Sequence, residues 1–159
     1  MIRLAVMIAI AVMTSPAFAC SRVGGPPTVA ESLASADEVF IAHLVSVKEI
    51  VMKGPEREEG PILEGQYRLI EVLKGKPARS GKVHDLPFGP GNCSLGLMVG
   101  WDYVFMIKRA TEFPRLRWVG MFSGSFPLGP YREAGQSEES ELVEVRNILK
   151  AQTSVKQTP

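Results

Sequence analysis

Two cysteines are the residues of this 159-residue chain with the clearest capacity for chemistry. Cys20 directly follows a segment with the parts of an export signal: Arg3, an apolar run over residues 4–13, a break at Pro16 and the ending Ala17-Phe18-Ala19. We expect residues 1–19 to be a signal peptide, so that Cys20 begins the mature protein with a free α-amino group. Because the apolar run is too short to span a bilayer, we expect release and no stable membrane span.

The same cysteine admits a second interpretation, because a bacterial lipoprotein is also cleaved just before a cysteine, which is then acylated. Phe18 is bulky where such a signal usually has a small residue, and Ala17 stands where leucine is usual. We therefore expect an extracytoplasmic protein, periplasmic or secreted. A membrane-anchored lipoprotein is the alternative.

Cys93 is the other cysteine, and export would place both thiols in an oxidising compartment. We therefore predict a disulfide between Cys20 and Cys93. It would close a loop of about 73 residues and stabilise the fold by about 4 kcal/mol in the chain-entropy model.

Composition limits the function classes. Removing Arg3 from the 18 Lys and Arg residues leaves 17, which equals the number of Asp and Glu residues. Nucleic-acid binding needs a basic face, so we do not expect it for a mature chain of balanced charge. The length suits one domain, which we place at residues 20–150, followed by a flexible tail at 151–159.

Helix signals flank the central part of the chain. Thr28, with Glu31 three residues later, predicts a capping box for a short helix that ends at residue 34. Ser137 is placed to cap a C-terminal helix. The apolar stripe of that helix would consist of Leu142, Val145, Ile148 and Leu149.

Five strands are predicted between the helices, at residues 38–52, 63–74, 81–88, 101–108 and 116–122. Simple alternation along the first strand places Val45 and Val47 on the face of Val39. A change of apolar phase after Leu69 predicts either a bulge in the second strand or a strand that passes between two environments. The predicted fold class is all-β with flanking helices: a five-stranded OB-type Greek-key barrel with a short N-terminal helix and a C-terminal helix. A β-sandwich or an open α+β sheet fits the same pattern.

Several segments resemble the netrin-like domain of the tissue inhibitors of metalloproteinases and related bacterial proteins, which share an OB barrel. They are the mature start Cys20-Ser21, residues 36–42 (ADEVFIA), residues 67–75 (YRLIEVLKG), and Cys93 followed by residues 100–105 (GWDYVF). The resemblance extends over most of the mature chain. Its more specific part is the order of first cysteine, first strand, Lys-Gly turn, second cysteine and aromatic strand.

This resemblance implies a function. In the inhibitor family, the α-amino nitrogen and carbonyl oxygen of a first-residue cysteine chelate the catalytic zinc of the protease, and a disulfide holds that residue. Cys20 and Cys93 match these positions, and Ser21 matches the small residue that enters the specificity pocket. Arg22 stands where the family has a second early cysteine. The implied function is a protein-binding module resembling a metalloproteinase inhibitor; the alternative is an envelope lipoprotein or structural module without inhibitory activity.

Other candidate residues give weaker signals. His43, His84 and Asp85 could serve acid–base or metal chemistry, but neighbours in a strand point to opposite faces, so His84 and Asp85 do not pair simply. Ser94 lacks a G-x-S-x-G setting, and the sequence has no phosphate loop or Cys/His zinc spacing. We therefore predict no enzymatic activity, no cofactor and no intrinsic metal. The expected partner is a zinc metalloproteinase or another envelope or extracellular protein.

Overall fold

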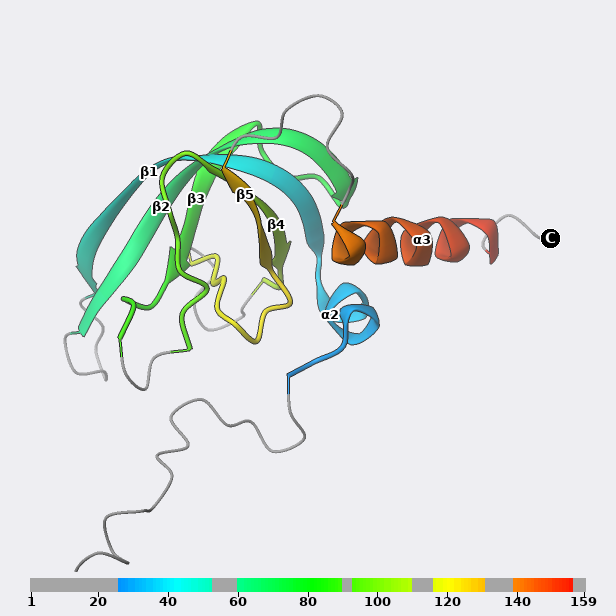
Figure 1. The fold of residues 1–159 in the computed structure, drawn as a ribbon, viewed down its shortest axis with the longest axis horizontal. Helices are drawn as coiled ribbons and strands as arrows, with labels where there is room; N and C mark the ends of the chain where they lie inside the picture. The colour runs from blue at the N-terminus through cyan, green and yellow to red at the C-terminus, as the bar shows by residue number, and fades with distance from the viewer. Residues whose placement is uncertain (1–25, 53–59, 90–92, 110–115, 131–138, 156–159) are drawn as a thin grey trace, which may run out of the picture.

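The computed structural model describes residues 26–52, 60–89, 93–109, 116–130 and 139–155. The elements in chain order are α2 (Val29–Ser35), β1 (Glu38–Met52), β2 (Gly60–Lys74), β3 (Ser80–Asp85), β4 (Trp101–Ile107), β5 (Phe126–Pro130) and α3 (Ser140–Val155). The described strands form one antiparallel sheet in the order β3-β2-β1-β4-β5, which is strongly curved (Figure 1). The prediction of a mostly-β fold with flanking helices is confirmed.

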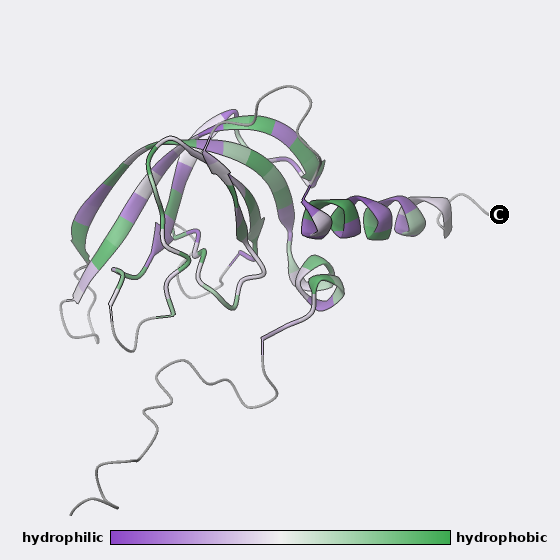
Figure 2. Cartoon of the chain, viewed as in Figure 1, coloured by the Kyte–Doolittle hydropathy of each residue, from purple (hydrophilic) through white to green (hydrophobic). Residues whose placement is uncertain are grey.

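β1 is the central strand of this sheet. It pairs with β2 over most of its length, and its first residues, from Glu38 to His43, pair with β4 on the other side. β3 and β5 end the strand order and are not neighbours in the described sheet. Apolar and polar residues are interspersed along much of β1 and β2 (Figure 2). Residues 39–42 of β1 are all apolar, because successive side chains point to opposite faces and both faces are covered there.

Three register shifts between β1 and β2 change which residues face inward. The pairing skips Ile70 and Leu73 in β2, which confirms the predicted bulge in that strand. It also skips Val45 in β1, and Val45 is exposed. The extra residue in β1 reverses the alternation, so Val47 packs against the same buried cluster as Leu44. The prediction that Val47 shares the face of Val39 was therefore wrong.

The last strand also differs from the prediction. Residues 116–122 were predicted as a strand, but they contribute only isolated bridges, at Trp118 and Gly120. The fifth strand is β5, in a segment that contains Pro127 and Pro130 and was not predicted as a strand. β5 pairs in the sheet with β4 alone. An edge strand of this kind tolerates Pro127 and Pro130, because one of its sides needs no backbone donors.

The sheet separates two apolar cores. The inner core lies within the curve of the sheet, and its buried members are Phe40, Ala42, Leu44, Tyr67, Val83, Leu97, Tyr103, Phe105, Ile107 and Val119. The outer core lies between the sheet and the two helices, and its buried members are Leu33, Ala36, Val39, Ile41, Val104, Met106, Leu128, Leu142 and Val145. β1 and β4 contribute to both cores, because both of their faces are covered.

The two helices follow their sequence signals closely. Thr28 and Glu31 form the predicted capping box at the start of α2, with hydrogen bonds of 2.8 and 3.2 Å. In α3, the predicted stripe packs on the outer core through Leu142 and Val145. The predicted cap of this helix, Ser137, lies outside the described residues. α3 continues to Val155, past residue 150, where the domain limit had been placed.

None of the helices in the described ranges is long and apolar enough to cross a membrane.

Leu142→Ala should lower the free energy of unfolding by about 2–5 kcal/mol, because Leu142 is fully buried between α3 and the sheet. Val143→Ala is the matched control, since Val143 is 39% exposed, and it should cost about 0.5 kcal/mol or less. Urea denaturation followed by circular dichroism measures both values. Equal effects of the two substitutions would show that α3 does not pack as described.

Candidate functional site

The loop that carries Cys93 is held by a buried carboxylate. Asp85 ends β3 and is 1% exposed. Its Oδ1 accepts a hydrogen bond from Leu86 N at 2.8 Å. Its Oδ2 accepts three more from the residues after Cys93: Ser94 Oγ at 2.8 Å, Leu95 N at 2.9 Å and Gly96 N at 3.1 Å. One side chain therefore fixes both the exit from β3 and the Cys93 loop, here defined as residues 93–98.

The four donors around Asp85 suit an ionised carboxylate, which only accepts hydrogen bonds. Burial raises the pKa of Asp85, while the hydrogen bonds from Ser94 and from the backbone of Leu86, Gly96 and Leu95 oppose that rise. Among the residues that the structure describes, the carboxylate is thus compensated by hydrogen bonds and is in no ion pair with a basic side chain. This arrangement ties the loop to the strand through one residue.

A buried tyrosine provides a second anchor for the same loop. Tyr103 of β4 is fully buried, and its hydroxyl donates to Gly96 O at 3.0 Å and accepts from Met98 N at 2.8 Å. Burial raises the pKa of Tyr103, so its hydroxyl keeps the proton that it donates. The Cys93 loop is therefore attached to β3 by Asp85 and to β4 by Tyr103.

The third attachment comes from the segment after residue 116. Met121 N donates to Cys93 O at 3.0 Å, and Gly120 forms a bridge with Ser94. A Cβ added at Gly120 would lie 3.0 Å from Cys93 O, so a larger residue there would push against the loop. Met121, whose backbone bonds to this loop, has a side chain that is 50% exposed.

The residues predicted from the sequence as a binding site are only partly described. Cys93 is half-buried within the anchored loop. Cys20 and Ser21 lie outside the described residues, so the Cys20–Cys93 disulfide stays a prediction. Ser94 Oγ donates to Asp85 and accepts from Gly96 N at 3.0 Å, which gives this hydroxyl a structural role in the loop.

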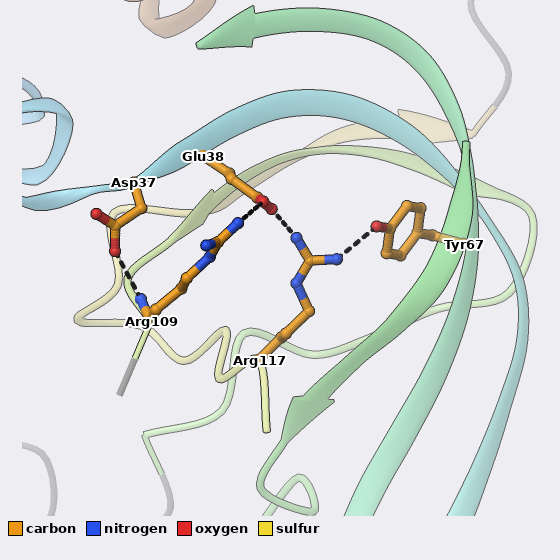
Figure 3. A network of polar contacts seen from close by, with 5 residues as sticks. All are labelled: Asp37, Glu38, Tyr67, Arg109 and Arg117. Carbon is orange, nitrogen blue, oxygen red and sulfur yellow. Dashed lines mark hydrogen bonds and ion pairs between the residues drawn. The ribbon is translucent and has the colours of Figure 1, made fainter. Parts of the chain in front are cut away.

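A second buried network lies at the start of β1 (Figure 3). Glu38 is 3% exposed and forms ion pairs with Arg117 and, at 2.9 Å, with Arg109. Arg117 Nη1 donates to Tyr67 Oη at 2.7 Å, and Arg109 N donates to Asp37 Oδ2 at 2.9 Å. Two cations thus compensate one buried carboxylate. Glu38, Arg109 and Arg117 also line a pocket of about 280 Å³.

Arg117 also covers the end of the inner core. The guanidinium carbon lies 5.7 Å from the centroid of the Phe40 ring and 5.9 Å from that of Tyr67, within the range of cation–π attraction. Burial lowers the pKa of Arg117 and raises the pKa of Tyr67. Each therefore keeps its proton at neutral pH, because the ordinary pKa values of both groups lie far above 7. The network is suited to closing the core rather than to moving a proton.

His84 lies between the segment that contains Arg117 and a third buried carboxylate, Glu64. The ring is 4% exposed, and its Nδ1 accepts a hydrogen bond from Arg117 N at 3.2 Å. Nε2 lies 3.7 Å from Glu64 Oε2. Burial lowers the pKa of His84 and outweighs the opposing attraction of Glu64. Because Nδ1 is an acceptor here, protonation of His84 would break its bond to Arg117 N.

Glu64 is stabilised in its charged form by two lysines. Burial would raise the pKa of Glu64, but hydrogen bonds and charge from Lys82 at 3.0 Å and Lys48 at 3.1 Å lower it overall. His84 thus contacts Glu64 and Arg117, whereas its neighbour Asp85 holds the Cys93 loop. The two neighbours have different partners, as strand geometry predicts.

Sequence analysis missed a polar pair on the outer face of the sheet. His43 of β1 and Asp102 of β4 are paired in register, and His43 Nδ1 lies 2.7 Å from Asp102 Oδ1. The two residues are 59 positions apart, so only the pairing of β1 with β4 brings them together. The pair could have been found only by predicting that β1 pairs with β4 and in which register.

Within the described ranges, no three His, Cys, Asp or Glu side chains gather closely enough to hold a metal ion. Comparison of the chain with models of protein families gives no match, and comparison with curated proteins gives none. The anchored Cys93 loop therefore has to be interpreted from its own geometry.

Asp85→Asn should loosen the Cys93 loop. An amide offers one accepting atom and one donating atom, so its NH₂ group would face backbone or hydroxyl donors. We expect a loss of about 1–3 kcal/mol in the free energy of unfolding and faster hydrogen exchange at the amides of Leu95 and Gly96. Glu49→Gln, at an exposed position of β1, is the control and should leave this exchange unchanged. Unaltered protection in the Asp85 variant would disprove the anchoring role.

The stability of the protein should fall as the pH drops below 6.5, the ordinary pKa of histidine, because the folded state lowers the pKa of His84. The unfolded chain binds a proton there first, so folding stability is present above that pH and is lost toward the lower folded-state pKa. His84→Gln keeps an acceptor and a donor but does not titrate. Chemical denaturation between pH 8 and pH 5 should therefore show a smaller fall for this variant.

His43→Gln retains His84 and should retain its contribution to the pH dependence. The raised pKa of Asp85 acts in the opposite direction, but Asp85 is present in all three proteins and cancels in the comparison. Glu64, whose pKa is lowered from 4.5, loses its contribution only at more acidic pH. Equal pH dependence in wild type and His84→Gln would rule out His84 as the titrating group.

Proposed function

We propose that this protein is an exported netrin-like module that binds a partner protein through the edge formed by the Cys93 loop and the mature N-terminus. The observation that carries the proposal is the anchoring of that loop by Asp85, with three hydrogen bonds from residues 94–96. A disulfide from Cys93 to Cys20 would extend this rigidity to the first mature residue. Pre-organisation of this kind lowers the entropy that binding costs.

The proposed architecture is an OB-type Greek-key barrel. Two features support it. The fourth strand pairs beside the first, which is the arrangement of a Greek key. The segment around Trp118 runs parallel to β3 at His84, where His84 N donates to Arg117 O at 2.7 Å and Val119 N donates to His84 O at 2.8 Å. These bonds lie on the open side of the sheet, where a barrel would close.

The proposed binding chemistry is chelation of a metalloproteinase zinc by Cys20. A catalytic zinc keeps one open position for water, and the α-amino nitrogen and carbonyl oxygen of a terminal residue can take it. The amine must be neutral to bind, and with an α-amino pKa of about 7.7–8.0 roughly a tenth is neutral at pH 7. Ser21 would enter the specificity pocket beside the zinc. Met121, exposed beside the Cys93 loop, would add apolar contact area.

The lipoprotein alternative shares Cys20 and differs in its chemistry. Acylation of the Cys20 thiol and amine would remove both the disulfide and the zinc ligand. The intact mass of the natively exported protein, with and without reductant, separates the two. A mass that begins at unmodified Cys20 and gains two hydrogens on reduction supports the proposal. An acylated Cys20 would make this a membrane-tethered module and exclude chelation.

Adding one alanine before Cys20 should abolish inhibition of zinc metalloproteinases, because the chelating amine would become an amide nitrogen without a basic lone pair. Inhibition of a panel of such proteases by the purified mature protein measures this, with a loss of at least roughly tenfold expected for the extended form. The control carries the same alanine after Pro159. Inhibition that survives the N-terminal alanine would sink the zinc mechanism; partner binding without inhibition would leave a non-inhibitory binding module.

A further inference from the structure

A pocket of about 410 Å³ lies on the outer face of the sheet, where residues from β1, β2, β4, β5 and α3 converge. Asp102 lines it, while the next residue, Tyr103, points into the inner core and holds the Cys93 loop. Residues on opposite faces of β4 therefore contact the pocket and the Cys93 loop. The volume of the pocket lies within the range of small-molecule binding sites.

The apolar part of the pocket consists of Ile41, Ile70 and Leu128. Ile41 and Leu128 belong to the outer core, and Ile70 is one of the residues that the β1–β2 pairing skips. The register shift leaves Ile70 54% exposed. An aliphatic group bound here would cover apolar surface that the fold leaves open to water.

Most of the charge in the pocket is already paired. Arg146 Nη2 of α3 lies 2.7 Å from Glu71 Oε2, and His43 Nδ1 lies 2.7 Å from Asp102 Oδ1. Arg68 of β2 is exposed, lines the pocket and makes no ion pair within the described part of the chain. When His43 is protonated, the lining thus presents one uncompensated guanidinium beside two internal ion pairs.

His43 offers a second polar contact. An ionised carboxylate only accepts hydrogen bonds, so His43 Nδ1 carries the hydrogen that faces Asp102 and Nε2 is left for a ligand. Asp102 fixes the orientation of the ring, as carboxylates do for histidines in binding sites. In its protonated form, His43 would donate from Nε2 to an anion that Arg68 also holds.

We propose that this pocket binds a small aliphatic carboxylate. Arg68 takes the carboxylate in a charge-assisted, two-pronged contact, protonated His43 provides the second donor from Nε2, and the aliphatic part covers Ile70 and Leu128. A single negative charge matches the single uncompensated guanidinium. A doubly charged phosphate fits less well, because Glu71 and Asp102 lie in the same lining.

The test uses N-acetyl-L-leucine and its neutral analogue N-acetyl-L-leucinamide, titrated into isotopically labelled mature protein by nuclear magnetic resonance. We expect the acid to shift the amide signals of the pocket residues at millimolar concentration and the amide analogue to shift them far less. Arg68→Gln should weaken binding of the acid roughly tenfold. His43→Gln should weaken it by a smaller factor.

Arg79→Gln is the matched control, because Arg79 is equally exposed on the turn before β3 and lies outside the pocket. It should bind the acid as the wild type does. Well-dispersed spectra of both arginine variants would show that the fold is intact. Equal binding of acid and amide, unchanged binding by Arg68→Gln, or no shifts at the pocket residues would overturn the proposal.

A free organic acid and the C-terminus of a peptide both supply this chemistry. 4-Methylpentanoate carries the same carboxylate and isobutyl group as N-acetyl-L-leucine without the amide. Tighter binding of 4-methylpentanoate assigns the pocket to free acids, and tighter binding of N-acetyl-L-leucine assigns it to peptide C-termini. Either result supports the carboxylate site.

Discussion

The fold depends on how an irregular segment, residues 116–121, covers the open side of the sheet. The backbone of this segment forms hydrogen bonds with both the N–H and the C=O group of His84. The side chain of Val119 is fully buried in the inner core. Its cation, Arg117, compensates the buried Glu38. Its last residues bond to the Cys93 loop. Breaking a buried ion pair leaves a charge uncompensated, which is costly, so this segment is secured even though it is not a strand.

Three carboxylates are buried in the described structure near this segment, and each is compensated differently. Glu38 is paired with arginines, Glu64 with lysines and Asp85 with hydrogen-bond donors. The third arrangement is the one that bears on binding, because uncharged donors from a loop lose their acceptor if the loop moves. Asp85 thereby makes the position of the Cys93 loop part of the stability of the fold.

Sequence periodicity was sufficient where a segment is regular and local. It predicted β1 with its bounds, the capping box of α2 and the apolar stripe of α3, because each depends on neighbouring residues. It failed at β5, because prolines oppose a strand except at an edge, and which strand lies at an edge is a property of the whole sheet. Periodicity could not predict the Asp85 anchor or the His43–Asp102 pair either, because each requires contacts between different elements of the fold.

The course of α3 decides how this protein can be handled experimentally. The helix packs on the sheet near its start, and residues 150–154 are exposed as it runs outward (Figure 1). An affinity tag or a fluorescent label placed after this helix would be separated from the sheet by its exposed turns. The same tag on the other end would block the residue on which the proposed chemistry depends. If the proposed chelation operates, recombinant material carrying a leftover N-terminal residue would therefore give a false negative in an assay of protease inhibition.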